Sequence, residues 1–341
     1  MRFSTTRILV AVFSVLVGAC GGSGSKGTPT APPSPSAPAS GSWSIAGAVS
    51  DAVTGLGLPN ATLTFQGSPA ATTDSNGRWQ LEGTGAPPTT VFVTKISAPG
   101  YYDRDTRIQW RSGGRSDVAL TLFPDRAPFS LDFFRMLIRN SYEEPESLEP
   151  LRRWTSNPNV YLNATNPKTK QKLLDSEIEM LEQTLRAVIP QATGGLLTLG
   201  EFEVGVTPRA ERAGYINIEI TYEPGSDNCG TALVGSNPGR IRLNYEACQV
   251  SWCRDAISPN VVAHEAGHAM GLWHVPDGMM VPTLEDCRGT TFTQAELLHA
   301  RLAYQRPAGN RDIDQDPSAF QALTVDTRRE VICHNAPARR N

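Results

Sequence analysis

Residues 261–274 read VVAHEAGHAMGLWH, and this stretch decides how the second half of the chain folds. Its spacing is His-Glu-x-x-His-x-x-Gly-x-x-His, and the specified positions are His264, Glu265, His268, Gly271 and His274. On a helix, two residues four apart lie about 40° apart around the axis and about 6 Å apart along it. His264 and His268 therefore share one helical face. Gly271 can adopt the left-handed conformation that ends a helix, so the chain can turn and bring His274 to the same place.

The three histidines in this arrangement predict a catalytic zinc site. With His264, His268 and His274 as ligands, the fourth position of one Zn²⁺ is left to water, whereas a structural zinc is closed by four protein ligands. Glu265 lies about 100° around the helix from His264, where it can reach the metal-bound water as general base without being a ligand. Because three of the chain's five histidines lie in this one stretch, accidental core histidines explain the pattern poorly.

This pattern resembles that of the metzincin clan of zinc endopeptidases, over roughly residues 150–305. In that clan a methionine packs beneath the zinc, and Met280 matches it because Met280-Val281-Pro282 is similar to the Met-Tyr-Pro of matrixins. The resemblance implies an α+β domain with a twisted mixed sheet and an active-site helix, which cuts protein or peptide substrates. No Pro-Arg-Cys-Gly latency segment is present. The acidic run of matrixins is not recognisable around residues 244–246, so structural calcium stays an open question.

Two segments before the motif bear on the substrate. GTALVG (230–235) resembles the edge strand with which an extended substrate pairs in metzincins, and GRIRLNY (239–245) resembles the strand after it. Both fit ordinary sheet strands equally well, since nothing in their composition marks a cleft. Other strands are predicted at 160–164, 202–206 and 215–222.

Three helices are expected in the same region. A helix over 168–190 presents one apolar face, made of Leu174, Ile178, Leu181, Leu185 and Val188. The motif's helix begins with Ser258 as N-cap and Pro259 at its first position. A last helix over 291–304 has Thr293 and Glu296 as a capping box, and we expect His299 on its surface rather than at the metal.

Residues 43–124 contain short alternating strands broken by turn residues. Strands are predicted at 42–50, 61–67, 77–83, 89–97 and 116–123. Asn76-Gly77 gives a hairpin signal between two of them. The order of Gly and Asn-Gly positions resembles the carboxypeptidase regulatory-like domain, which implies an all-β sandwich with a spacing or binding role.

The N-terminus has the composition of an export signal. Arg2 and Arg7 precede an apolar run from Ile8 to Val17, which is too short to span a bilayer. LVGAC (16–20) resembles a bacterial lipobox, which implies cleavage before Cys20 and a lipid on that cysteine. The alternative is an ordinary cleaved signal. We expect an exported bacterial lipoprotein, anchored to a membrane through Cys20 and facing the periplasm or the cell exterior.

The domain order follows from these segments. We expect a signal peptide (1–19), a Gly/Ser/Pro-rich tether (20–42), the β-sandwich (43–124), the metzincin-like catalytic domain (127–320) and a C-terminal tail (321–341). His334, beside Cys333 in that tail, is expected to be incidental to metal binding.

An exported chain is expected to form disulfides. The cysteines after the lipobox are odd in number: Cys229, Cys248, Cys253, Cys287 and Cys333. At most two bridges can form, and the sequence leaves fifteen arrangements open. Our preferred pairs are Cys229 with Cys248 and Cys253 with Cys287.

Composition narrows the function classes. The chain has 341 residues with 31 basic and 34 acidic side chains, a net charge of −3 and no dense basic block, which argues against nucleic-acid binding. We expect a monomeric zinc endopeptidase acting on protein or peptide substrates. The alternatives are a catalytically silent surface-binding lipoprotein and a zinc exopeptidase or amidase.

Overall fold

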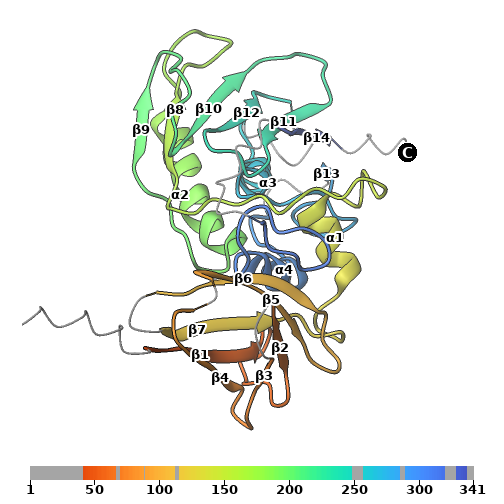
Figure 1. Ribbon diagram of the computed structural model, residues 1–341. Helices are drawn as coiled ribbons and strands as arrows, with labels where there is room; N and C mark the ends of the chain where they lie inside the picture. The colour runs from red at the N-terminus through yellow and green to blue at the C-terminus, as the bar shows by residue number, and fades with distance from the viewer. Residues whose placement is uncertain are drawn as a thin grey trace, which may run out of the picture. The chain divides into compact units, whose positions relative to one another are not determined.

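The computed structural model describes residues 41–66, 70–87, 89–111, 115–247, 256–284, 289–318 and 328–335 (Figure 1). All of them belong to one compact unit that spans Ser40–Asn341. The signal segment 1–19, nearly all of the tether and Cys20 lie outside the described residues. In the described part of the chain, none of the helices combines the length and apolarity that a bilayer crossing requires.

The first part of the unit contains two small β-sheets. Their strands are β1 (Ser42–Asp51), β2 (Thr62–Phe65), β3 (Ala71–Thr72), β4 (Arg78–Thr84), β5 (Val91–Ser97), β6 (Arg104–Gln109) and β7 (Arg115–Leu122). One sheet has the order β4-β1-β7 and the other β3-β2-β5-β6. Alternate residues of β4 and β5 are buried, and the inward side chains of both sheets share one core. Phe65 contacts Trp79 and Phe92 in that core.

The five predicted strands correspond to β1, β2, β4, β5 and β7, whereas β3 and β6 were not predicted. Strand β6 lacks an apolar alternation because two of its inward positions are Arg104 and Thr106. Both are buried because Asp316 accepts hydrogen bonds from them, at 2.8 Å and 2.6 Å. The hairpin prediction at residues 76–77 is wrong: a turn forms there, but β4 pairs with β1, and β3 pairs with β2 in the other sheet.

The second part contains a mixed sheet with four helices. Its strands are β8 (Asn159–Asn163), β9 (Phe202–Gly205), β10 (Tyr215–Thr221), β11 (Asn228–Leu233), β12 (Gly239–Asn244), β13 (Thr283–Leu284) and β14 (Glu330–Asn335). The order is β13-β14-β11-β12-β10-β8-β9. Three neighbouring pairs are parallel: β9 with β8, β8 with β10, and β10 with β12. Strand β11 is antiparallel to both β12 and β14. Strand β14 lies within residues 321–341, the segment that was predicted to be a C-terminal tail.

The helices are α1 (Leu131–Arg139), α2 (Asp175–Ala192), α3 (Pro259–Ala269) and α4 (Gln294–Ala303). Helix α1 was not predicted. In α2 the predicted face is buried at Leu181, Leu185 and Val188, but Leu174 precedes the helix as its N-cap and is 67% exposed. Helix α3 packs against α2 and against β11, β12 and β14 (Figure 1), so nearly all of its residues are buried.

The two sheets of the first part join the second part through both apolar and polar contacts. Phe123, which follows β7, belongs to the large core of the second part and stacks on Phe129. The Arg306 guanidinium donates to the Thr121 carbonyl oxygen at 3.1 Å, and Gln305 donates to the Ala52 carbonyl oxygen at 3.1 Å. These contacts fix the end of α4 against β1 and β7.

Candidate metal centre

The turn after α3 brings the third histidine back to the helix. Ser258 is the N-cap and Pro259 the first residue of α3, as predicted, and the helix ends at Ala269. Gly271 has a φ of +103°, and a Cβ at this residue would lie 2.1 Å from the carbonyl oxygen of Arg152. Only glycine avoids both the strain and the clash, so the predicted role of Gly271 in ending the helix is confirmed.

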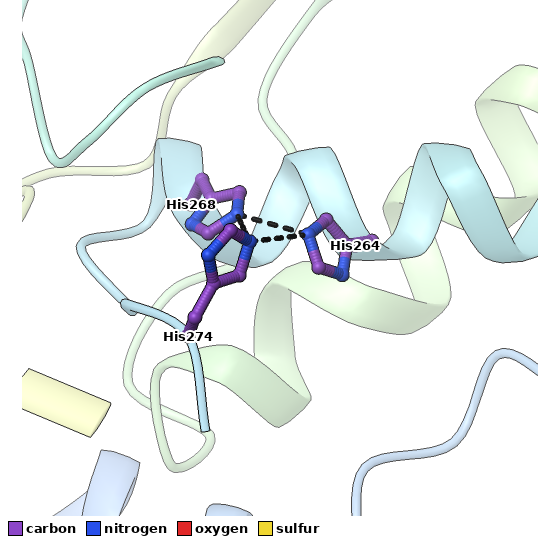
Figure 2. Close-up of side chains that lie close together, drawn as sticks. All are labelled: His264, His268 and His274. Atoms are coloured by element: carbon purple, nitrogen blue, oxygen red, sulfur yellow. Dashed lines mark hydrogen bonds between the residues drawn. The ribbon is translucent and has the colours of Figure 1, made fainter. Parts of the chain in front are cut away.

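Three imidazole nitrogens converge on one point. The Nε2 atoms of His264, His268 and His274 lie 2.9 to 3.2 Å from one another (Figure 2). In a tetrahedral zinc site with Zn–N distances of about 2.0–2.1 Å, ligand nitrogens are about 3.3–3.4 Å apart. The triad therefore has nearly the spacing of a loaded site, and these three residues could bind a metal ion.

The other nitrogen of each ring fixes the tautomer. Nδ1 of His264 donates to the Met279 carbonyl oxygen at 2.8 Å, and Nδ1 of His268 donates to the Leu272 carbonyl oxygen at 2.7 Å. A carbonyl oxygen has no proton to give, so the proton is on Nδ1 and Nε2 keeps its lone pair. Three such lone pairs at these distances repel one another unless a cation lies between them. This is the strongest indication of a metal in the described residues.

Glu143 supplies the remaining orienting contact and was not predicted. Its Oε1 accepts a hydrogen bond from Nδ1 of His274 at 2.5 Å. This hydrogen bond, against the opposing effect of burial, holds the pKa of Glu143 below its usual value. Carboxylates commonly orient metal-binding imidazoles in this way. The segment after α1 is rich in acidic residues, but nothing in its sequence links Glu143 to a histidine 131 residues later.

Burial keeps His264 and His268 neutral. It lowers the pKa of His264 to about 3, with His274 as the next cause, and it lowers the pKa of His268 well below the usual value. A neutral imidazole is the form that binds a metal. The electrostatics of the pocket therefore agree with the tautomers that the hydrogen bonds fix.

Glu265 is fully buried beside the triad. Among the described residues neither of its carboxylate oxygens has a hydrogen-bond partner. Burial, and next the charge of Glu330, raise the pKa of Glu265 well above its usual value. A Cβ on Gly230 of β11 would lie 2.7 Å from Glu265 Oε1, so glycine at this position lets the strand pass directly over the carboxylate.

Both methionines of the following turn contact α3. The Met279 carbonyl oxygen orients His264, as above, while Met280 is fully buried and its sulfur lies 2.5 Å from where a Cβ of Gly267 would be. The Met280 amide donates to Glu296 Oε1 at 2.8 Å. Met280 thus packs under the helix that carries two of the histidines.

Cys333, which was not predicted to lie near the metal site, is close to His264 and Glu265. Ligand atoms of His264, Glu265 and Cys333 lie within 4.8 Å of one another, and all three residues are buried. Cys333 is on β14, which pairs with β11. The prediction that β11 is the edge strand is therefore wrong, because residues near the C-terminus add a strand along it. No sequence pattern indicates this pairing, because it joins residues 228–233 to residues 330–334.

The remaining histidines do not join the triad. The expectation that His299 lies on a helix surface is wrong: it is 1% exposed and its Nε2 accepts a hydrogen bond from the Ser130 amide at 3.0 Å. Its helix α4 packs against α1 and α2, which covers that face. The predicted capping box of Thr293 and Glu296 is confirmed. His334 Nδ1 lies 3.7 Å from Asp227 Oδ1, and His334 belongs to neither group of residues that could hold a metal ion.

Disulfide bonding is described at one position. Cys229 is disulfide-bonded, whereas Cys333 carries a thiol, which lies 3.9 Å from the His334 carbonyl oxygen. The other cysteines named in the two preferred pairings, Cys248, Cys253 and Cys287, lie outside the described residues. Both pairings therefore stay predictions.

Comparisons with known proteins add little to this geometry. The sequence matches no protein family and no curated protein. Structural similarity is found to a type II cohesin–X-dockerin complex from Acetivibrio cellulolyticus (14% identity, 24% of this chain and 58% of that chain, TM-score 0.19). It is also found to chlorocatechol 1,2-dioxygenase from Pseudomonas putida (15% identity, 25% and 60%, TM-score 0.20) and to a DUF3823 family protein from Parabacteroides merdae (11% identity, 25% and 47%, TM-score 0.20). The chain thus spans about half the length of these proteins, and TM-scores this low carry no argument about function.

Proposed function

We propose that this chain is a zinc endopeptidase of the metzincin type. The observation that carries the proposal is the convergence of three unprotonated Nε2 atoms within 3.2 Å, next to a buried carboxylate that is not one of them. Three imidazole ligands with an adjacent glutamate that is not a ligand are typical of a hydrolytic zinc site, in which the fourth position is left for water. Met280 beneath α3 agrees with the metzincin resemblance.

The residues of the chain have separable roles in this proposal. A bound zinc ion would act as a Lewis acid that lowers the pKa of water toward neutrality and polarises the scissile carbonyl. The histidines hold the ion, and Glu143 with the Met279 and Leu272 carbonyl groups hold the histidines. Glu265 takes the proton of the attacking water on its carboxylate and passes it to the leaving amine nitrogen.

The test compares Glu265→Gln with His268→Ala. Because Glu265 is not a ligand, Glu265→Gln keeps about one zinc per chain while cleavage falls by about 10²- to 10⁴-fold. His268→Ala loses the metal, since two imidazoles bind zinc far more weakly than three. Glu179→Gln, which alters an exposed glutamate of α2, is the matched control and leaves both quantities unchanged.

Two measurements on the same preparations decide the result. Zinc content comes from elemental analysis, and cleavage comes from mass spectrometry of new N-termini in an unfolded protein substrate. Near wild-type cleavage by Glu265→Gln would refute the proposed proton transfer. The positions of the cuts distinguish an endopeptidase from an exopeptidase or an amidase. No feature of the described residues favours either of those two alternatives.

One observation favours a second candidate, a catalytically silent surface-binding protein with a structural metal. His264 and His268 are fully buried and His274 is 1% exposed, so the site as described is closed to a substrate. Under this alternative the chain holds zinc and cuts nothing, even after the site has been opened.

We propose in addition that the protein is an exported monomer held at a membrane by a lipid on Cys20. Support comes from the sequence alone, in the apolar run 8–17 and the lipobox-like residues 16–20. Cys20→Ser is expected to move the protein from the membrane fraction to the soluble exported fraction. Unchanged membrane association would refute the lipid anchor.

A further inference from the structure

The third histidine of the triad depends on the part of the chain around α1 for its position. The other two histidines lie on α3, so the helix itself sets their separation, whereas His274 lies beyond the end of that helix. The Trp273 amide donates to the Leu137 carbonyl oxygen of α1 at 2.7 Å. Nδ1 of His274 donates to Glu143 Oε1 at 2.5 Å. The third ligand is therefore placed by α1 and by the segment after it, residues 140–152.

Main-chain hydrogen bonds fix both ends of segment 140–152. The Glu149 amide donates to the Arg139 carbonyl oxygen at 2.9 Å, which closes the segment into a loop at the end of α1. The Leu151 amide donates to the Asn310 carbonyl oxygen at 2.8 Å. The segment that orients His274 is thus attached to the residues that follow α4.

Asn310 is fully buried, and both N–H groups of its side-chain amide are hydrogen-bonded. Its Oδ1 accepts a hydrogen bond from the Arg139 guanidinium at 2.6 Å, and the same guanidinium donates to the Asn310 carbonyl oxygen at 2.8 Å. Its Nδ2 donates to Asp314 Oδ1 at 3.0 Å and to Asp316 Oδ1 at 2.9 Å. Oδ1 therefore bonds to the end of α1, and Nδ2 bonds to two aspartates.

These two aspartates are bonded to β6, at the edge of the small sheet β3-β2-β5-β6. The Asp105 amide donates to the Asp314 carbonyl oxygen at 3.1 Å, and the Asp316 amide donates to the Asp105 carbonyl oxygen at 2.8 Å. The Asp316 carboxylate also accepts hydrogen bonds from Arg104 and Thr106. The aspartates that hold the Asn310 amide are therefore fixed to the first part of the folded unit.

We propose that Asn310 is a positioning residue for the metal centre, through which the small sheets fix the third ligand, His274. Its amide lies between Arg139, where segment 140–152 begins, and the aspartates held by β6. Breaking hydrogen bonds of a buried amide is costly, so the amide holds these two sides at a constant separation. This assigns the first part of the protein a role in metal binding. The inference requires that the triad binds a metal, and it does not require peptidase activity.

The expected effect on metal affinity is smaller than that of the direct contact. Loss of a group that hydrogen-bonds a metal ligand typically lowers the affinity by about 10- to 100-fold, and Glu143 is such a group. Asn310 acts one step further away, through segment 140–152. Residues that act at a distance typically change such affinities by about 3- to 30-fold, which is the range we expect for the loss of its amide.

Zinc titration of the full chain carrying Asn310→Ala tests the proposal. The variant is expected to fold, because Arg139 keeps its hydrogen bond to the Ile313 carbonyl oxygen at 3.2 Å. Asp314 and Asp316 each keep an arginine partner. Competition with a chromogenic chelator is expected to show a Kd for Zn²⁺ that is about 3- to 30-fold higher than in wild type.

Asn217→Ala is the matched control. Asn217 is also a buried asparagine, on β10, and its side-chain amide donates to the Arg209 carbonyl oxygen at 2.9 Å. The same substitution there removes a buried amide without touching segment 140–152, so the Kd for Zn²⁺ is expected to stay at the wild-type value. An equal rise in both variants would assign the effect to general destabilisation and overturn the proposal.

A double-mutant cycle with Glu143→Ala distinguishes positioning from a general structural role. If Asn310 acts through segment 140–152, its loss matters little once Glu143 no longer holds His274. The fold-change of the double variant is then at least about threefold smaller than the product of the two single fold-changes. A fold-change equal to the product would overturn the proposal. If Asn310→Ala does not fold, Arg139→Lys takes its place in the cycle, because lysine keeps the charge but loses the planar group that bonds Asn310.

The zinc titrations also separate this inference from the proposed function. Absence of zinc binding by wild type would refute the metal centre and both proposals with it. Zinc binding with the same Kd in wild type and Asn310→Ala would refute the positioning role and leave the peptidase untouched. A weaker Kd in Asn310→Ala, together with the expected cycle, supports the positioning role whether or not the chain cleaves protein substrates.

Discussion

Glu143 Oε1 and His274 Nδ1 lie 2.5 Å apart, which joins the segment after α1 to the loop that carries the third histidine. Of the three acceptors that orient the triad, this one alone is a side chain, since the other two are main-chain carbonyl groups. It is therefore the one orienting contact that a substitution can remove directly.

We expect Glu143→Ala to lower the zinc affinity by about 10- to 100-fold without removing a ligand. The physical reason is that the His274 ring loses the partner that fixes its tautomer and orientation. Competition titration with a chromogenic chelator measures the change. Glu146→Ala removes a nearby exposed carboxylate and serves as control; an equal loss in both variants would assign the effect to general charge.

Gly271→Ala is expected to lower the free energy of unfolding by about 2–4 kcal/mol, because left-handed strain adds to a clash with a main-chain oxygen. Gly195 also has a positive φ, +81°, but a Cβ there meets nothing within 4 Å. Gly195→Ala should therefore lose only the strain, about 1–2 kcal/mol. Urea unfolding measures both, and equal losses would show that the contact with Arg152 has no consequence.

Asp314→Asn tests a fully buried ion pair. Asp314 receives two hydrogen bonds from Arg306, at 2.7 Å and 2.6 Å, and neither side chain is exposed. Removing one partner leaves a buried charge uncompensated, so we expect a loss of about 3–5 kcal/mol in unfolding free energy. Glu182→Gln, which breaks a surface pair with Arg186 on α2, should cost about 0.5 kcal/mol or less. Comparable losses would contradict this contrast.

Asp51 is expected to make the protein less stable in acid. Burial alone would raise its pKa, but hydrogen bonds from the Thr54 amide, the Tyr101 hydroxyl and the Val53 amide outweigh burial, so the pKa lies below its usual 3.8. Its stabilising contribution is thus complete above the unfolded-state pKa and is lost as the pH falls through the lower, folded-state value. The difference in unfolding free energy between wild type and Asp51→Asn should shrink as the pH falls below about 4. A difference that is constant with pH would argue against this assignment.

The sequence predicts the metal centre well where the geometry is local. His264 and His268 are one helical turn apart, and Gly271 sets the next turn, so their spacing along the chain fixes their positions in space. The strands of the first part follow from alternation in the same way. In each case the residues that decide the structure lie within a few positions of one another.

The rest depends on partners far along the chain. Strand β6 shows no apolar alternation in the sequence, because two of its buried residues are Arg104 and Thr106. Both donate hydrogen bonds to Asp316, which lies 210 or more residues further along the chain. Glu143 and Cys333 reach the centre from 131 and 69 residues away, as a hydrogen-bond acceptor and as a strand partner of β11. Such pairings leave no periodicity in a single sequence, so only the folded arrangement reveals them.

The hydrogen bonds between the small sheets and the second part limit how recombination could exchange these two parts with other proteins. Arg104 and Thr106 find their acceptor on Asp316, and the end of β7 finds its donor on Arg306. A recombination that carried residues 42–122 into another protein would leave the acceptor Asp316 and the donor Arg306 behind. The transferred piece would expose groups that are buried here, and the remainder would expose Arg306. We therefore expect the two parts to be inherited together as one unit, and not to be exchanged separately between proteins.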